Sequence, residues 1–130
     1  MPSYDALHYD PPAPIAQVML RAPNGTIVSD VLLLLDTGAD TTLLPRSAVT
    51  RLGINIDPAL QYELVGFDGS RSTSEAIDLD MIFLQKAFRG RYLIIDSERG
   101  ILGRDVLASV SILLNGPAQE WSQHPLIVPQ

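Results

Sequence analysis

The 130-residue sequence contains no cysteine, so neither a disulfide nor a thiolate metal site can form. Basic residues are few: nine Lys and Arg stand against fifteen Asp and Glu, which gives a formal net charge of -6 at pH 7. This balance argues against nucleic-acid binding, because phosphates call for clustered cationic side chains. Long apolar runs are lacking too. The longest, at 31–35, is far too short to span a bilayer.

The N-terminus also lacks the features of a signal peptide, since residues 1–17 have neither a basic start nor an apolar centre. His8 and His124 lie near the two ends, without the spacing of metal ligands. We therefore expect a soluble, cytoplasmic protein that uses no metal and no cofactor, and that has neither nucleic acid nor membrane as a partner.

The residues that are present indicate one globular domain with a sizeable core. Hydrophobic residues make up 46% of the chain and charged residues 18%, a balance typical of folded domains. A chain of this length buries roughly two thirds of its unfolded surface. Segment 1–14 carries four prolines, so we interpret it as an N-terminal arm, and 15–130 as the domain.

Short apolar runs separated by turn signals predict an all-β domain. Asn24-Gly25 is a strong hairpin signal, because both residue types tolerate positive φ. Pro45 and Gly53 bracket a segment that could form a short helix. We expect strands at 15–21, 26–28, 31–35, 61–65, 73–79, 81–84, 92–95 and 111–114, helices at 45–52 and 104–110, and turns at 66–70, 89–91 and 115–117.

The segment with the clearest chemistry is Asp36-Thr37-Gly38, which directly follows the apolar run 31–35. A carboxylate behind a buried strand is costly unless it has a partner or a purpose. A strand that ends in a tight loop would hold Asp36 rigidly, and Gly38 would allow another chain to approach closely. The same three residue types are also common in ordinary β-turns, and for this tripeptide alone both interpretations stay open.

Two longer motifs resemble a known family. Asp36-Thr37-Gly38-Ala39-Asp40, followed by Thr41-Thr42-Leu43-Leu44-Pro45, resembles the catalytic segment of retropepsin-like aspartic proteases. Ile101-Leu102-Gly103-Arg104-Asp105 resembles the second half of that signature, in which an apolar pair precedes Gly-Arg-Asp or Gly-Arg-Asn at the start of a helix. The resemblance covers roughly residues 15–121. It implies an all-β, closed acid-protease barrel with one or two short helices, and a homodimer whose active site lies on the twofold axis.

The resemblance also implies roles for individual residues. Asp36 would be the catalytic aspartate, Thr37 would hydrogen-bond to the partner subunit's equivalent loop, and Gly38 would approach the substrate backbone. The segment 66–70 would close over the substrate as a flap, although viral members have a glycine-rich tip where this chain has Phe67 and Asp68. The expected substrate-binding residues are Ala39, Asp40, Gly66, Phe67, Asp68, Gly69, Ile101 and Leu102, with Leu34 and Val65 adding apolar pockets.

The same resemblance implies a structural ion pair between Asp40 and Arg104 beneath the active-site loop. The alternative is that Gly103-Arg104-Asp105 is a plain turn and that Arg104 makes an exposed ion pair, worth less than about 1 kcal/mol. A partly buried pair would matter more, because removing either partner leaves a charge without compensation.

The chemistry of peptide hydrolysis supports a homodimer independently of the family. Two carboxyl groups are needed, one deprotonated to activate water and one protonated to polarise the carbonyl. The chain contains a single Asp-Thr-Gly, so a twofold axis would bring Asp36 of two copies together. We therefore predict an aspartic endopeptidase that acts on peptides or proteins. The alternative is a catalytically silent module that uses the same fold for dimerisation or peptide binding.

Overall fold

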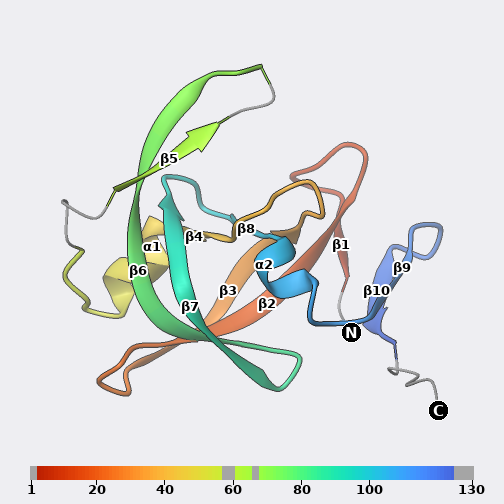
Figure 1. Cartoon of the computed structure of the whole chain (residues 1–130). Coiled ribbons are helices and arrows are strands. Elements are labelled where there is room, and N and C mark those ends of the chain that lie inside the picture. The colour runs from red at the N-terminus through yellow and green to blue at the C-terminus, as the bar shows by residue number, and fades with distance from the viewer. Residues whose placement is uncertain (1–2, 57–60, 66–67, 125–130) are drawn as a thin grey trace, which may run out of the picture.

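A computed structural model describes residues 3–56, 61–65 and 68–124 of the chain (Figure 1). Within these residues the protein is mainly β, as predicted, with two short helices. The elements are β1 (Tyr4–Asp5), β2 (Ala13–Arg21), β3 (Ile27–Leu35), β4 (Leu43–Pro45), α1 (Arg46–Arg51), β5 (Gln61–Val65), β6 (Arg71–Phe83), β7 (Lys86–Ile95), β8 (Gly100–Leu102), α2 (Arg104–Leu107), β9 (Ile112–Asn115) and β10 (Glu120–Gln123).

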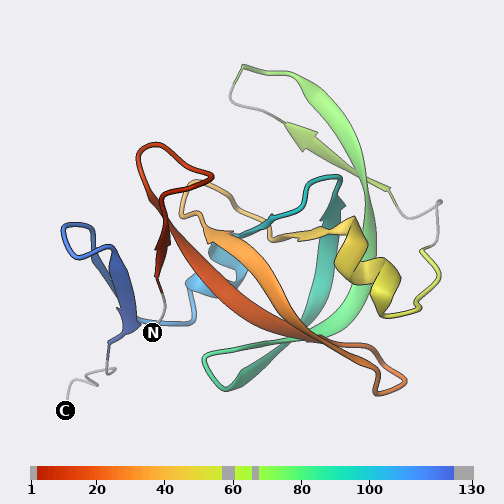
Figure 2. The ribbon, with the colours of Figure 1, turned by 180° about the vertical axis from the view of Figure 1, so that it is seen from behind.

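The main sheet curls back on itself. Its strand order is β1-β2-β3-β8-β4-β7-β6-β5, and a further pairing joins β2 to β6. That pairing, with Leu20 opposite Met81, links the strands from β2 to β6 into a ring. Most neighbours run antiparallel, but β3 pairs with β8 and β4 pairs with β7 in parallel. Figure 2 shows β2 and β3 crossing the back of this ring.

The ring closes around a core of aliphatic side chains. Strand alternation explains the inward positions: Val31, Leu33 and Leu35 are buried, while Leu32 and Leu34 between them are half-buried. The run 31–35 therefore lies in the middle of the sheet, between β2 and β8. The fully buried side chains of Leu20, Leu44, Met81 and Leu102 come from four other strands and meet in the same core.

Two long strands, β6 and β7, form a hairpin whose turn differs from the prediction. The turn lies at Leu84 and Gln85, which have φ values of 51° and 65°, and not at 89–91. Gly90 lies inside β7, where a side chain would meet the ring of Tyr92 at 3.2 Å from Cζ. Glycine is there to admit the tyrosine, so the Arg-Gly-Arg sequence was a false turn signal.

The two helices are shorter than predicted. α1 covers Arg46–Arg51 and packs its buried Ala48 and Val49 against the barrel. α2 covers only Arg104–Leu107, although the prediction extended it to 110. No helix in the described part of the chain is long and apolar enough to cross a membrane.

The two ends of the described chain meet beside the barrel. β1 pairs with the start of β2, so the proline-rich segment lies against the domain. β9 and β10 form a separate two-stranded ribbon, which a bridge between Ser3 and Glu120 joins to the N-terminal segment. Trp121 is buried, and its indole N–H donates to the carbonyl of Ile15 at 2.8 Å.

Candidate active site

Asp36 lies in the loop between β3 and β4, at the point where the buried β3 strand ends. Its backbone N–H donates to the carbonyl of Leu102 at 3.0 Å, which continues the parallel pairing of β3 with β8 by one residue. Its Oδ1 accepts the N–H of Gly38 at 2.9 Å, and its carbonyl accepts the N–H of Ala39 at 3.2 Å. The carboxylate is half-buried and held in one orientation by its own loop.

The segment around Gly103 lies directly beneath this loop. The N–H of Arg104 donates to the carbonyl of Ala39 at 2.8 Å. A side chain at Gly103 would lie 2.7 Å from the carbonyl carbon of Thr41 and 3.0 Å from the carbonyl oxygen of Ala39. Gly103 is therefore required for the close approach of two backbones, which explains why the two motifs of the sequence belong together.

A buried threonine locks these two segments to each other. Thr42 is fully buried, and its hydroxyl donates to Asp105 Oδ1 at 2.6 Å while accepting the N–H of Gly103 at 3.0 Å. Its backbone N–H donates to Asp105 Oδ2 at 3.0 Å. Both carboxylate oxygens of Asp105 thus bind one residue that lies 63 positions away in the sequence.

The predicted ion pair between Asp40 and Arg104 is not formed among the described residues. Arg104 Nη1 instead donates to the carbonyl of Thr37 at 2.5 Å, and Asp40 accepts only the Thr41 hydroxyl, at 3.3 Å. The bond that joins the two motifs is made one residue further on, by Asp105. The sequence analysis named only Asp40 as the acidic partner, and the backbone geometry of the loop brings Asp105 to Thr42 instead.

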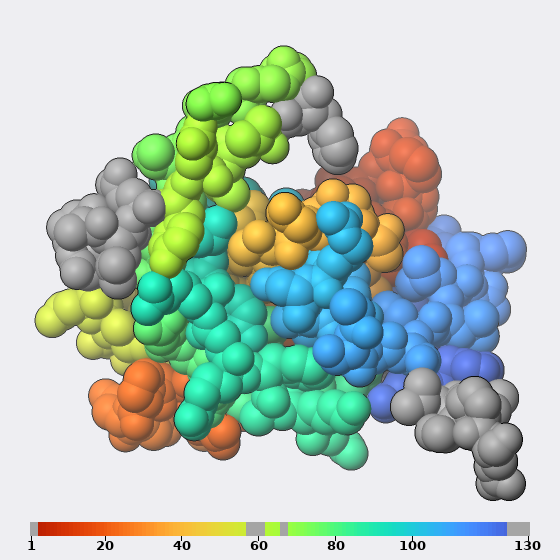
Figure 3. Space-filling view, in the orientation of Figure 1, coloured from red at the N-terminus to blue at the C-terminus, as the bar shows by residue number. Residues whose placement is uncertain are grey.

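An open cleft of about 450 Å³ extends over the loop, towards the hairpin of β5 and β6. Figure 3 shows the hollow between the arch of β5 and β6 and the surface beneath it. Five predicted site residues line the cleft: Asp36, Gly38, Ala39, Asp40 and Ile101. Val65, Ser70 of the predicted flap segment and Arg104 of the predicted ion pair also line it, and the structure adds Thr41, Leu43, Leu64 and Ser72.

Other predicted residues lie elsewhere. Leu102 is fully buried in the core and cannot contact a substrate, because its side chain points inward while Ile101 points to the cleft. Leu34 does not line this cleft, and Thr37 is exposed beside it. The register of the short strand β8 could not be predicted from the sequence, so the two neighbouring residues could not be assigned to opposite sides.

The tip of the β5–β6 hairpin is described only in part. Gly66 and Phe67 lie outside the described residues. Asp68 and Gly69 are exposed, and Gly69 has a φ of 84° with open space around it. Hydrogen bonds from Ser70 hold the pKa of Asp68 below its ordinary value, since they stabilise the charged carboxylate. This part of the hairpin is an ordinary polar turn on the surface.

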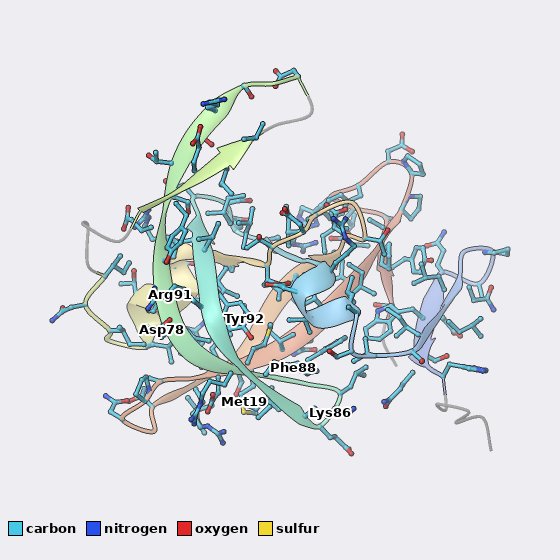
Figure 4. The ribbon with its side chains drawn as sticks, viewed as in Figure 1. Met19, Asp78, Lys86, Phe88, Arg91 and Tyr92 are labelled. Atoms are coloured by element: carbon cyan, nitrogen blue, oxygen red, sulfur yellow. The ribbon has the colours of Figure 1, made fainter. Side chains whose placement is uncertain are left out.

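The lower part of the hairpin is connected to its neighbours by ion pairs. Arg91 on β7 binds both carboxylate oxygens of Asp78 on β6, at 2.8 and 2.9 Å, and donates to the Tyr62 hydroxyl on β5 (Figure 4). Arg46 on α1 makes a similar two-point contact with Glu75, at 3.0 Å for both bonds. These contacts hold the pKa of Asp78 and of Glu75 below the ordinary range.

A smaller set of residues forms a second cavity of about 430 Å³ beside the cleft. The two share Asp40, Thr41, Leu64 and Val65, and the second adds Tyr62, Glu63, Arg91 and Leu93. Across the described ranges, no group of three His, Cys, Asp or Glu side chains could hold a metal ion.

Comparisons with known proteins agree with this geometry. Residues 17–106, which contain both motifs, match the aspartyl protease family. Among solved structures, the fold is similar to that of the EIAV protease complexed with the inhibitor HBY-793, with a TM-score of 0.55 and 27% sequence identity, over 74% of this chain and 86% of that one. A comparison with curated proteins gives no match. The chain has a retropepsin-like fold and belongs to the aspartyl protease family.

Proposed function

We propose that the chain is one subunit of a homodimeric aspartic endopeptidase, in which Asp36 of each copy supplies one of the two catalytic carboxyls. The observation that carries the proposal is the position of Asp36, half-buried in the floor of the cleft on a loop with fixed geometry. One chain provides a single such carboxylate, and a second copy would provide the other.

In this mechanism the two carboxyls share one proton, because two such groups about 3 Å apart cannot both ionise. The charged carboxylate takes a proton from a water molecule as that water attacks the peptide carbonyl. The protonated carboxyl donates a hydrogen bond to the carbonyl oxygen and stabilises the charge that develops there. Since one carboxyl must stay protonated, cleavage is expected to be fastest at acidic pH.

The shape of the cleft suits an extended peptide. Such a peptide would lie as a strand between the loop after β3 and the β5–β6 hairpin, which acts as the flap. Gly38 exposes backbone to it, while Val65 and Ile101 supply apolar walls. The second cavity, which continues from the first past Asp40, gives room for a further side chain of the substrate.

The test is cleavage of a diverse peptide library from about pH 3 to pH 8, with the dimer monitored by light scattering. Asp36→Asn keeps the size of the side chain and removes its charge, so it should lower kcat/KM by at least about 1000-fold while the dimer stays folded. Asp30→Asn is the matched control, since Asp30 lies on the same strand, is exposed and does not line the cleft.

Three results would overturn the proposal. A rate that keeps rising up to about pH 9 would exclude a mechanism that needs a protonated carboxyl. A well-folded dimer that cleaves no peptide of the library would favour the silent dimerisation or peptide-binding module. Equal activity of wild type and Asp36→Asn would show that any cleavage comes from elsewhere.

A further inference from the structure

The second cavity, beside the cleft, is lined by three charged side chains: Asp40, Glu63 and Arg91. It opens into the cleft, because Asp40 and three uncharged residues line both spaces. A side chain of a peptide in the cleft could therefore enter the cavity. The charge that it would meet there depends on which of the three lining groups are already compensated by a neighbour.

Two of the three charges are compensated. Arg91 binds both carboxylate oxygens of Asp78 on the adjacent strand, at 2.8 and 2.9 Å (Figure 4), and a further N–H donates to the Tyr62 hydroxyl at 2.9 Å. Such a two-point contact neutralises the guanidinium. Glu63 lies 3.2 Å from the guanidinium of Arg71 across the hairpin. An exposed pair of this kind contributes little to stability, but it keeps a cation beside the carboxylate.

Asp40 is the charge without compensation. Within the described ranges its carboxylate makes no ion pair, and it accepts one hydrogen bond, from the Thr41 hydroxyl at 3.3 Å. The side chain is exposed. Arg104, the cation of the neighbouring motif, donates to the carbonyl of Thr37 instead and lines the cleft but not the cavity. The cavity therefore presents one net negative charge to whatever enters it.

The wall beside this carboxylate is aliphatic. Leu64 and Val65 of β5 line the cleft and the cavity, and Leu93 of β7 lines the cavity. Lysine and arginine side chains have the same two parts, an apolar stem and a cationic end. Their stem can pack on the leucines while the cation pairs with Asp40. A neutral aliphatic side chain gains only the packing, and a glutamate meets a like charge.

We propose that the cavity selects a lysine or arginine side chain of the substrate, and that Asp40 recognises its cationic end. The inference rests on the proposed function, because the cleft must hold a peptide before the cavity can receive a side chain. The twofold axis of the proposed dimer places one such cavity on each side of the bond to be cut. One position on each side therefore prefers a basic residue. The net charge of -6 favours the same substrates, since an acidic protein attracts basic peptides over longer distances.

The first test varies the substrate alone. Each position of a peptide that the wild type cleaves is replaced in turn by lysine, norleucine, glutamine and glutamate, and cleavage is measured at about pH 5. Norleucine is the matched control, because it has the stem of lysine without the charge. Lysine should exceed norleucine in kcat/KM by about fivefold at one position on each side of the bond, and glutamate should fall below both. Lysine-to-norleucine ratios below about twofold at every position overturn the inference.

The second test asks whether Asp40 causes the preference. Asp40→Asn keeps the shape of the side chain and removes its charge, so the lysine-to-norleucine ratio should fall to about one. Asp30→Asn makes the same change at an exposed residue that lines neither space, and it should keep the ratio of the wild type. If Asp40 held only the peptide backbone or its own loop, Asp40→Asn would slow both substrates alike. An unchanged ratio in Asp40→Asn therefore overturns the inference.

The two proposals can fail separately, because binding can be measured without cleavage. Calorimetry with Asp36→Asn compares the affinities of the lysine and norleucine peptides, and the double variant Asp36→Asn, Asp40→Asn shows whether the difference depends on Asp40. Tighter binding of the lysine peptide that is lost in the double variant, with no cleavage by the wild type, would keep the selective cavity and remove the protease. Cleavage that depends on Asp36 but has no preference for a basic residue would do the opposite.

Discussion

The loop that carries Asp36 and the β5–β6 hairpin face each other across one cleft, but different forces hold them. The loop is bound from below by backbone hydrogen bonds and by the buried Thr42, whose hydroxyl and N–H both bind Asp105. The upper hairpin is held by its antiparallel pairing and by the ion pair between Glu63 and Arg71, which is well exposed on both sides. Exposed pairs of this kind contribute little to stability.

This difference separates two tasks that an enzyme must combine. The floor holds the Asp36 carboxylate in one orientation, as the proposed catalysis would require. The hairpin is connected by contacts that can break and re-form at small cost, which suits a part that must open to admit substrate. Substitutions of the same chemical kind should therefore change stability and peptide cleavage strongly in the floor and only weakly in the hairpin.

Substituting alanine for a glycine should give the largest contrast. Gly103→Ala forces a Cβ against the backbone of Thr41, and backbone cannot move aside without shifting the loop. We expect the free energy of unfolding to fall by about 3 kcal/mol and peptide cleavage to fall by at least about tenfold. Gly69→Ala meets open space and bears only the strain of its positive φ, about 1 kcal/mol.

Urea unfolding at one fixed protein concentration measures both variants, since the stability of the proposed dimer would depend on concentration. Equal losses in the two variants would contradict the distinction between floor and hairpin. So would full activity in Gly103→Ala, because it would mean that the loop does not need its support.

Removing a carboxylate should give the next largest contrast. Asp105→Ala leaves the hydroxyl and N–H of the buried Thr42 without their acceptor, so we expect a loss of about 2 kcal/mol. Asp68→Ala also removes a carboxylate that accepts a backbone N–H, that of Ser70, but solvent can replace it there. Its unfolding midpoint should match that of the wild type. A larger loss in Asp68→Ala than in Asp105→Ala would reverse the comparison.

The difference between local and long-range contacts explains which features could be predicted from the sequence. Asp36-Thr37-Gly38 was recognisable because a strand, a tight loop and a polar residue are all encoded within a few neighbouring positions. Gly103 was found with its motif, but its purpose, the close contact with Thr41, depends on a pairing of distant strands. Local chemistry indicated where the candidate site is, and long-range geometry decided how its loop is held.

The wrong predictions have the same origin. The bond between Thr42 and Asp105 joins residues 63 positions apart and was not predicted. The predicted connection between the two motifs was an ion pair between Asp40 and Arg104. Leu102 was assigned to the substrate site because inward and outward positions cannot be told apart on a three-residue strand. The turn at Leu84 and Gln85 has no glycine to announce it.

A third prediction extends the comparison from the floor to the barrel beneath it. Tyr92 is buried on β7, and its hydroxyl donates to the carbonyl of Phe88 at 2.6 Å. Burial, with the nearby charges of Asp105 and Asp80, raises the pKa of Tyr92 to about 12. The folded state therefore keeps this proton after the unfolded chain has lost it, so its contribution is present below about pH 10 and is lost as the pH rises towards 12.

At pH 11 this linkage should reduce the free energy of unfolding by about 1 kcal/mol. Tyr92→Phe loses the hydrogen bond at every pH but should not show this additional decline above pH 10. Urea unfolding at several alkaline pH values measures the two slopes. Parallel slopes for the wild type and Tyr92→Phe would show that other groups cause the alkaline loss.

The smallest effect is expected at the ion pair where the hairpin joins the barrel. Arg91 lowers the pKa of Asp78 by hydrogen bonding to the charged carboxylate, so the contribution of this pair is present above the ordinary pKa and is lost as the pH falls through the lowered one. Both side chains are about half exposed, and water can replace each contact.

Asp78→Asn should therefore cost far less stability than Asp105→Ala. The difference between it and the wild type should shrink as the pH falls below the ordinary carboxyl pKa of about 4 and vanish once Asp78 of the wild type is protonated. A cost as large as that of Asp105→Ala would mean that the hairpin is anchored as firmly as the floor, and that its opening must be sought nearer to its tip.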